Sequence, residues 1–194
     1  KHLFRLLGLN PMAESKVSGG FFLDNIGASL MGGVVITHPS KKTVFPMGHI
    51  PQALIVVVTP AYKLLTRKAR KILPRKVRLE HVIANLSNAC SIVAAVAGRD
   101  VRMFGTAICD RLIEPVRARH IPGFDEVKKA ALKMGALGCS ISGAGASVFA
   151  VTDNPDCVSI IGLAMQRAFG RHGLDSLVTV TRMDGKGARI LKTT

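Results

Sequence analysis

The chain has 194 residues, and 48% of them are hydrophobic, which excludes a disordered polypeptide and allows one domain or two small ones. The net charge of +15 fits a solvated basic surface, a polyanion-binding patch or a pocket for a phosphorylated ligand. With no Trp and one Tyr, the chain has few aromatic side chains for stacking on single-stranded nucleic acid.

The N-terminal part of the chain predicts one short helix and two strands. Asp24 and Asn25 suit the N-cap of a helix over 26–31. Alternating, β-branched residues over 33–38 predict a strand, and residues 41–47 predict a second strand after a turn.

After residue 50 the sequence pattern changes between strands and helices. The continuously apolar run over 53–59 predicts a buried central strand. A basic helical stretch follows Pro60 and runs to about Leu73. The remaining predicted elements are helices over 77–97, 100–113 and 124–137, strands near 138–141 and at 147–152, a helix over 155–170, and strands over 176–182 and 187–192. This order predicts an α+β domain of ferredoxin-like type, with a mostly antiparallel sheet and helices on one face.

Cysteines and apolar runs bear on where the protein works. No apolar run reaches about 18 residues without a charge or a turn former, so the sequence predicts no transmembrane helix. The four cysteines form no C-x-x-C pair and predict reduced, mostly buried thiols in a cytoplasmic compartment, with disulfides as the alternative. The chain starts at Lys1 without a visible signal peptide, and a preceding targeting segment, plastid or other, stays open.

A loop with almost no side chains, Ser142-Gly143-Ala144-Gly145-Ala146, lies between two short apolar runs. Its glycines can adopt positive φ and expose their N–H groups, and successive N–H groups form a concave site for an anion. A tight hairpin between two strands also favours glycine, so the loop by itself leaves both interpretations open.

Four blocks of the sequence occur in the order found in one family of enzymes. They are AESKVSG…DNIGASLMGG (13–33), VVTPAYKLLTRKAR…LP (57–74), DRLIEPVRARHIPGFDEVKKAALKMGALG (110–138) and GALGCSISGAGASVFAV (135–151). The last block resembles the third motif of the GHMP kinases. Together the blocks resemble the homoserine kinase family, over the C-terminal two-thirds of its members.

The resemblance implies a transferase that uses ATP and Mg²⁺ to phosphorylate the side-chain hydroxyl of L-homoserine, a step of threonine biosynthesis. Such kinases act by positioning and electrostatic stabilisation. The resemblance further implies that residues 1–45 are the tail of the N-terminal GHMP kinase domain and that residues 46–194 are the C-terminal domain. It leaves a homodimer open.

The resemblance also assigns roles to particular residues. Glu14 matches the Mg²⁺ ligand, and a hard cation favours such an oxygen ligand. Asp24 and Asn25 match the catalytic pair beside the amino acid and the transferred phosphate, and Asp24 also contacts the substrate. Without the family, an exposed helical Glu and a plain helix N-cap are the alternatives.

The homoserine pocket and the phosphate loop are assigned in the same way. Thr66 and Arg70, four residues apart on one helix face, match positions that hold homoserine together with Arg117, and an Arg fork suits its carboxylate. The resemblance makes part of the run over 63–78, which holds eight basic residues, a substrate pocket instead of a solvated face. The matching phosphate loop consists of Ser142, Gly143, Ala144 and Gly145.

The sequence departs from the family pattern at three points. Phe22 stands where the family usually has His, which removes an imidazole from the substrate, and Ala146 replaces a usual Pro. No P-x-x-x-G-L-G-S-S-A stretch, the family's ATP phosphate loop, occurs in the 194 residues, so we expect no competent ATP site in this chain alone.

Two other functions remain as alternatives. One is a catalytically inactive, kinase-derived module that binds an amino acid, which the missing ATP loop and Phe22 favour. The other is a nucleic-acid-binding domain, motivated by the net charge of +15 and disfavoured by the lack of aromatic interleaving and of zinc or recognition-helix motifs.

Overall fold

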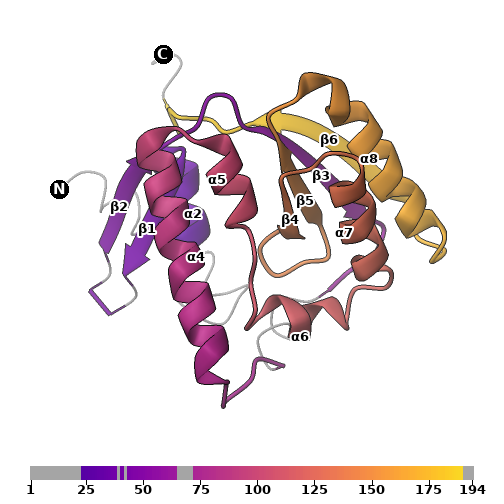
Figure 1. Cartoon of the computed structure of the whole chain (residues 1–194), viewed down its shortest axis with the longest axis horizontal. Coiled ribbons are helices and arrows are strands. Elements are labelled where there is room, and N and C mark those ends of the chain that lie inside the picture. Colours follow the sequence, from indigo (N-terminus) through magenta and orange to yellow (C-terminus); the bar gives the residue numbers. More distant parts are fainter. Residues whose placement is uncertain (1–22, 39, 42, 65–71, 190–194) are drawn as a thin grey trace, which may run out of the picture. The chain divides into compact units, whose positions relative to one another are not determined.

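The computed structural model describes residues 23–38, 40–41, 43–64 and 72–189, shown as coloured ribbon in Figure 1. The chain divides into two compact units. One consists of Lys1–Pro51 and Met183–Thr194, and the other is Gln52–Arg182. The assignment of residues 1–45 and 46–194 to two kinase domains stays a prediction.

The first unit contains α2 (Leu23–Met31) and an antiparallel pair of strands, β1 (Val34–His38) and β2 (Thr43–Gly48). Both strands agree with the prediction. The helix begins earlier than predicted, so Asp24 and Asn25 lie in its first turn and do not form its N-cap.

The C-terminal segment returns to the first unit. The N–H of Gly33 donates to the carbonyl oxygen of Asp184 at 2.6 Å, and the N–H of Ala188 donates to that of Ser29 at 3.1 Å. Residues 187–189 form no strand, so this part of the strand predicted over 187–192 is wrong. Residues 190–192 lie outside the described part.

The second unit is built on a four-stranded antiparallel sheet in the order β4-β5-β3-β6. The strands are β3 (Leu54–Pro60), β4 (Gly138–Ile141), β5 (Val148–Thr152) and β6 (Ser176–Arg182). As predicted, the apolar run over 53–59 forms the central strand β3, in which Val56 and Val58 are buried.

Two helices, α7 (Phe124–Lys133) and α8 (Pro155–Gly170), cover one face of this sheet (Figure 1). The side chain of Asn154 caps α8 by accepting from the N–H of Asp156 at 3.0 Å. Phe169 and Met165 of α8 and Val127 of α7 are fully buried in the core that these helices form with the sheet. The predicted α+β class, an antiparallel sheet with helices packed on it, is confirmed.

The helix predicted over 100–113 is too long, because helical structure ends at Thr106 and residues 107–113 form a loop. After α4 (Leu79–Gly98), Asp100 caps α5 (Val101–Thr106), and α6 (Glu114–Ala118) follows seven residues later. The helix predicted over 124–137 also ends early, at Lys133, because Gly135 adopts a φ of +97°.

Helix α4 exposes apolar side chains along most of its length. Leu79, Ile83 and Leu86 are 72%, 57% and 65% exposed, whereas Ala95 and Val96 are buried. In the described part of the chain it is the one helix long and apolar enough to cross a membrane, a property that many soluble helices share. Because most of its apolar side chains are exposed, α4 packs only slightly against the rest of its unit.

All four cysteines are free thiols, in agreement with the prediction of reduced cysteines. Cys139 is buried and Cys157 is partly buried, but Cys90 on α4 and Cys109 in the loop after α5 are exposed. The prediction of mostly buried thiols is wrong, because Cys90 lies on the exposed surface of α4 and Cys109 lies in a surface loop.

Candidate functional site

The glycine loop connects β4 to β5 as a tight turn. The N–H of Ser142 donates to the carbonyl oxygen of Ser147 at 2.8 Å, and the N–H of Gly145 donates to that of Ser142 at 3.0 Å. Gly143 and Gly145 have φ angles of +57° and +92°, so both positions require the conformational freedom of glycine. The hairpin interpretation of the sequence is therefore correct as a description of the backbone.

The same loop has an open side. A Cβ atom added to Gly143 would meet no atom within 4 Å, whereas one added to Gly145 would lie 2.8 Å from Cδ1 of Ile121. Among the described residues, the N–H groups of Gly143 and Ala144 donate to no protein acceptor. N–H groups on an open turn can donate hydrogen bonds to an anionic ligand, so the anion-site interpretation also fits the geometry.

Arg117 connects α6 to this loop. One terminal nitrogen of its guanidinium donates to the carbonyl oxygen of Gly143 at 2.8 Å. The structure thus brings together two regions that the sequence singled out separately, the arginine of the Glu-Pro-Val-Arg stretch and the glycine loop. A guanidinium has five donors, so it can bind this carbonyl and a carboxylate together.

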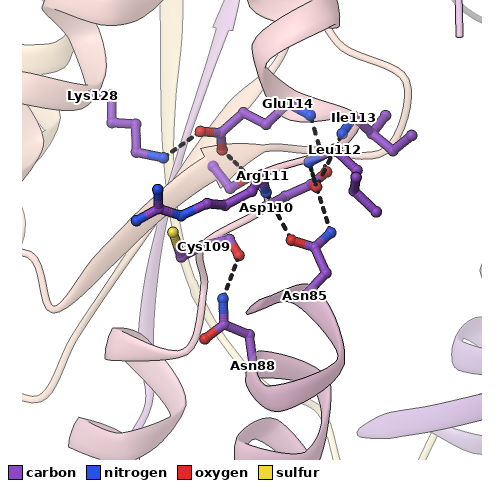
Figure 2. Close-up of polar contacts among 10 residues, drawn as sticks. Asn85, Asn88, Cys109, Asp110, Arg111, Leu112, Ile113, Glu114 and Lys128 are labelled. Atoms are coloured by element: carbon purple, nitrogen blue, oxygen red, sulfur yellow. Dashed lines mark hydrogen bonds and ion pairs between the residues drawn. The ribbon is translucent and has the colours of Figure 1, made fainter. Parts of the chain in front are cut away.

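The loop before α6 is held by Asp110 (Figure 2). Its carboxylate accepts from the N–H groups of Leu112, Ile113 and Glu114 at 2.8–3.0 Å and from the side chain of Asn85 on α4 at 2.7 Å. Burial alone would raise the pKa of Asp110, but these hydrogen bonds outweigh it and lower the pKa below its ordinary value.

Two amide side chains of α4 hold this loop from the other side. Oδ1 of Asn85 accepts from the N–H of Arg111 at 2.8 Å, and Nδ2 of Asn88 donates to the carbonyl oxygen of Cys109 at 2.7 Å. Figure 2 shows both amides pointing from α4 toward the loop. The two asparagines are polar positions in the largely apolar α4, and their side chains bind the backbone of the loop that leads into α6.

Glu114 anchors α6 to the rest of the unit. Its side chain is 10% exposed, forms an ion pair with Lys128 of α7 and accepts a hydrogen bond from the hydroxyl of Ser140 on β4 at 2.5 Å. Two other elements, α7 and β4, therefore hold the helix that carries Arg117. Sequence reasoning missed Glu114, Lys128 and Ser140, because a buried ion pair leaves no periodic signal.

Cys139 lies beside this ion pair. Burial raises the pKa of its thiol to about 12, with smaller and opposing effects of Lys128 and Glu114. The thiol is therefore protonated at neutral pH and is no nucleophile.

The remaining predicted site residues lie in the other unit or outside the described part of the chain. Asp24 and Asn25 are exposed on α2, which belongs to the other unit. The residues Glu14, Phe22, Thr66 and Arg70 lie outside the described part of the chain. Their predicted roles therefore stay predictions.

The described part of the chain contains no group of three or more His, Cys, Asp and Glu side chains that could hold a metal ion. Because Glu14 lies outside that part, the structure supplies no donor set for the Mg²⁺ ion that the resemblance implies. A Mg²⁺ ion bound with a nucleotide commonly takes most of its ligands from phosphate and water.

Comparison with known proteins defines the class. The model of the family described as GHMP kinases C terminal matches residues 92–171, a range that includes α6, α7, the glycine loop and α8. The second unit has the α+β fold of these proteins, and a mevalonate kinase of L. major shares it at a TM-score of 0.56 and 15% identity. The chain therefore contains a GHMP kinase C-terminal domain.

Within this class the chain is similar to homoserine kinases. It is 39% identical to the homoserine kinase of Arabidopsis thaliana, covering 92% of this chain and 50% of that protein, and 35% identical to that of Chlorobaculum tepidum. The crystal structure of homoserine kinase from Cytophaga hutchinsonii superimposes with a TM-score of 0.89 at 33% identity, covering 95% of this chain and 59% of the other. The chain thus spans little more than half the length of these relatives and resembles their C-terminal part.

Proposed function

We propose that this chain provides the C-terminal part of a kinase that transfers the γ-phosphoryl group of ATP to the side-chain hydroxyl of L-homoserine. The observation that carries the proposal is the hydrogen bond from Arg117 to Gly143. It holds a guanidinium, which can bind a carboxylate, beside a loop whose N–H groups can donate to an anion. The similarity to homoserine kinases over nearly the whole chain supports the substrate. By this proposal the protein is a transferase of threonine biosynthesis that works in the cytoplasm or a plastid.

Arg117 would bind the α-carboxylate of homoserine. Its guanidinium is held at the glycine loop by the carbonyl oxygen of Gly143, and α6 is fixed by Asp110 and Glu114, so the donors keep one orientation. Such preorganisation reduces the entropy lost when the substrate binds. The proposal adds Thr66 and Arg70 as further homoserine contacts.

The glycine loop would stabilise negative charge on the transferred group. Among the described residues, the N–H groups of Gly143 and Ala144 have no protein acceptor and so can donate to phosphate oxygens, and a Cβ added at Gly143 would meet no atom within 4 Å. Donors that already point at the developing charge need no rearrangement in the transition state. Ser142, which is exposed at the same turn, would add a hydroxyl donor.

The proposal assigns Asp24 and Asn25 to the acceptor hydroxyl and Glu14 to Mg²⁺ on the resemblance alone. Mg²⁺ neutralises phosphate charge when it is bound with ATP.

The proposal is tested by isothermal titration of the chain with L-homoserine, with and without Mg-ATP, while ADP formation is measured. We expect binding that Arg117→Gln weakens about 10- to 100-fold, since a hydrogen bond to a charged group contributes about 1.5–3 kcal/mol. Arg119→Gln, at the exposed residue directly after α6, is the matched control and should bind as the parent does. Arg70→Ala tests the second predicted carboxylate contact.

The outcomes separate the two functions. Homoserine binding without ADP formation is expected for both functions in this chain alone, so the decisive comparison is a longer protein that supplies a P-x-x-x-G-L-G-S-S-A stretch before Lys1. ADP formation by the longer protein would support the kinase, and binding without ADP formation there would favour an amino-acid-binding module. Equal weakening by Arg117→Gln and Arg119→Gln would contradict the assigned role of Arg117. Absence of binding would contradict a homoserine pocket built by these 194 residues.

A further inference from the structure

A second candidate ligand site lies between α7 and α8, away from the glycine loop. The two helices enclose a surface hollow of about 400 Å³, a volume that suits a small metabolite. Its apolar lining includes Ala130, Met134 and Ala164, and three cations, Lys129, Lys133 and Arg167, line it too. These six residues, together with Glu126 and Arg171, form the α7–α8 hollow.

The hollow carries an excess of positive charge. Its carboxylate, Glu126, is already engaged, with Oε2 at 3.4 Å from Nε of Arg171 and Oε1 at 2.9 Å from Nε2 of His172. In the described part of the chain, no carboxylate lies within ion-pair distance of Lys129, Lys133 or Arg167. Three unneutralised cations around one concave surface attract an anion.

Helix stability explains the charges only in part. Lys133 and Arg167 lie in the last turns of their helices, where a cation interacts favourably with the helix dipole. That interaction needs no cavity beside it. The hollow exists because two small residues, Ala130 and Ala164, line it where longer apolar side chains would fill the space.

We propose that the α7–α8 hollow binds a small organic phosphate. The apolar body of the ligand lies on Ala130, Met134 and Ala164, and its phosphate oxygens accept from the cations around them. Lys and Arg are the residues that bind phosphate with charge-assisted hydrogen bonds. The hollow shares no residue with the glycine loop or with Arg117, so this inference does not depend on the proposed kinase function.

The test uses the intact chain and two probes, phenyl phosphate and inorganic phosphate, in an NMR titration of backbone amides. We expect the amides of Ala130 and Ala164 to shift and phenyl phosphate to bind at least fivefold more tightly than inorganic phosphate. Ala164→Leu keeps every charge and fills the hollow, and it should remove this preference. An unchanged preference in Ala164→Leu would overturn the proposal.

A chain with a net charge of +15 can attract phosphates non-specifically, so a pair of charge-matched variants separates that attraction from binding in the hollow. The double variant Lys133→Gln/Arg167→Gln should weaken phenyl phosphate binding at least tenfold. The double variant Arg182→Gln/Lys186→Gln removes the same charge elsewhere and should change it less than twofold. Equal weakening in both would mean non-specific attraction to the basic surface and would refute a site in the hollow.

Discussion

At the residue scale, one carboxylate decides the course of the chain between α5 and α6. The carboxylate of Asp110 accepts hydrogen bonds from three backbone N–H groups and one side-chain amide. These bonds replace the backbone hydrogen bonds that the same N–H groups would have made in a continuous helix. Asp, Asn and Ser compete with helices in this way wherever their side chains can reach the backbone. This turn determines where Arg117 stands relative to the glycine loop.

Asp110→Ala should lower the free energy of unfolding by about 1–3 kcal/mol at pH 7, because it leaves partly buried donors without an acceptor. The pKa of Asp110 is lower in the folded state, so its contribution is present above the unfolded pKa of about 3.9 and is lost as the pH falls through the folded pKa. Urea unfolding between pH 2 and 7 measures the difference. Asp175→Ala is the control, since that exposed side chain makes no hydrogen bond or ion pair in the described structure, and a loss equal to that of Asp110→Ala would contradict the assignment.

The thiols should differ sharply in reactivity. Cys139, with a pKa of about 12 and a buried side chain, should stay unmodified by a thiol-specific disulfide reagent at pH 8 until the protein unfolds. Cys90 and Cys109 are exposed and should react rapidly in the native state. Mass spectrometry of the labelled peptides measures this, and native labelling of Cys139 at the rate of Cys90 would show that its environment is open.

At the element scale, α4 and α8 are two apolar helices with different surroundings. The side chains of α8 fill the core above β3, while α4 contributes Asn85 and Asn88 to the loop before α6 and leaves Leu79, Ile83 and Leu86 exposed. Hydrophobic periodicity predicted α4, and the Asn-Pro start predicted α8, both correctly. It did not show which of them is buried, because the burial of a helix depends on what packs against it.

A pair of alanine substitutions measures this difference. Leu86→Ala on α4 should change the free energy of unfolding by less than about 0.5 kcal/mol, the usual range for exposed positions. Ile161→Ala on α8 removes a fully buried side chain and should cost about 2–5 kcal/mol. Chemical denaturation gives both values, and a cost for Leu86→Ala comparable to that for Ile161→Ala would show that α4 is covered in solution.

At the scale of the whole molecule, the chain divides into two compact units. The unit Gln52–Arg182 contains the complete four-stranded sheet, its two covering helices, the glycine loop and Arg117. The other unit joins Lys1–Pro51 to Met183–Thr194 through backbone hydrogen bonds such as that between Gly33 and Asp184. Two segments far apart in the sequence thus depend on each other.

The fragment Gln52–Arg182 should fold on its own, because its sheet and hydrophobic core are complete within these residues. We expect a single cooperative unfolding transition by circular dichroism and amide NMR signals that overlap those of the intact chain for β3, β5 and α8. A fragment that lacks the cooperative transition, while the intact chain retains it, would show that Lys1–Pro51 or Met183–Thr194 stabilises the sheet.

The sequence alone determined much of the element pattern and the fold class. The apolar run of β3, the Asn-Pro start of α8 and the glycines of the loop are local signals, because each depends on the preference of a few neighbouring residues. The order of strands and helices then predicted the antiparallel α+β arrangement. Where a local signal was overruled, as in the helix predicted over 100–113, a single side chain, Asp110, supplied the competing hydrogen bonds.

Only the tertiary structure decided how the candidate site is assembled within the second unit. The contact of Arg117 with Gly143 joins residues 26 positions apart, and the anchoring of Glu114 by Lys128 and Ser140 joins three different elements. Neither has a periodic or compositional signature, because a contact between distant residues depends on how the intervening elements pack. For the same reason the α7–α8 hollow, formed by side chains of two antiparallel helices, could not be predicted from the run of residues in either helix.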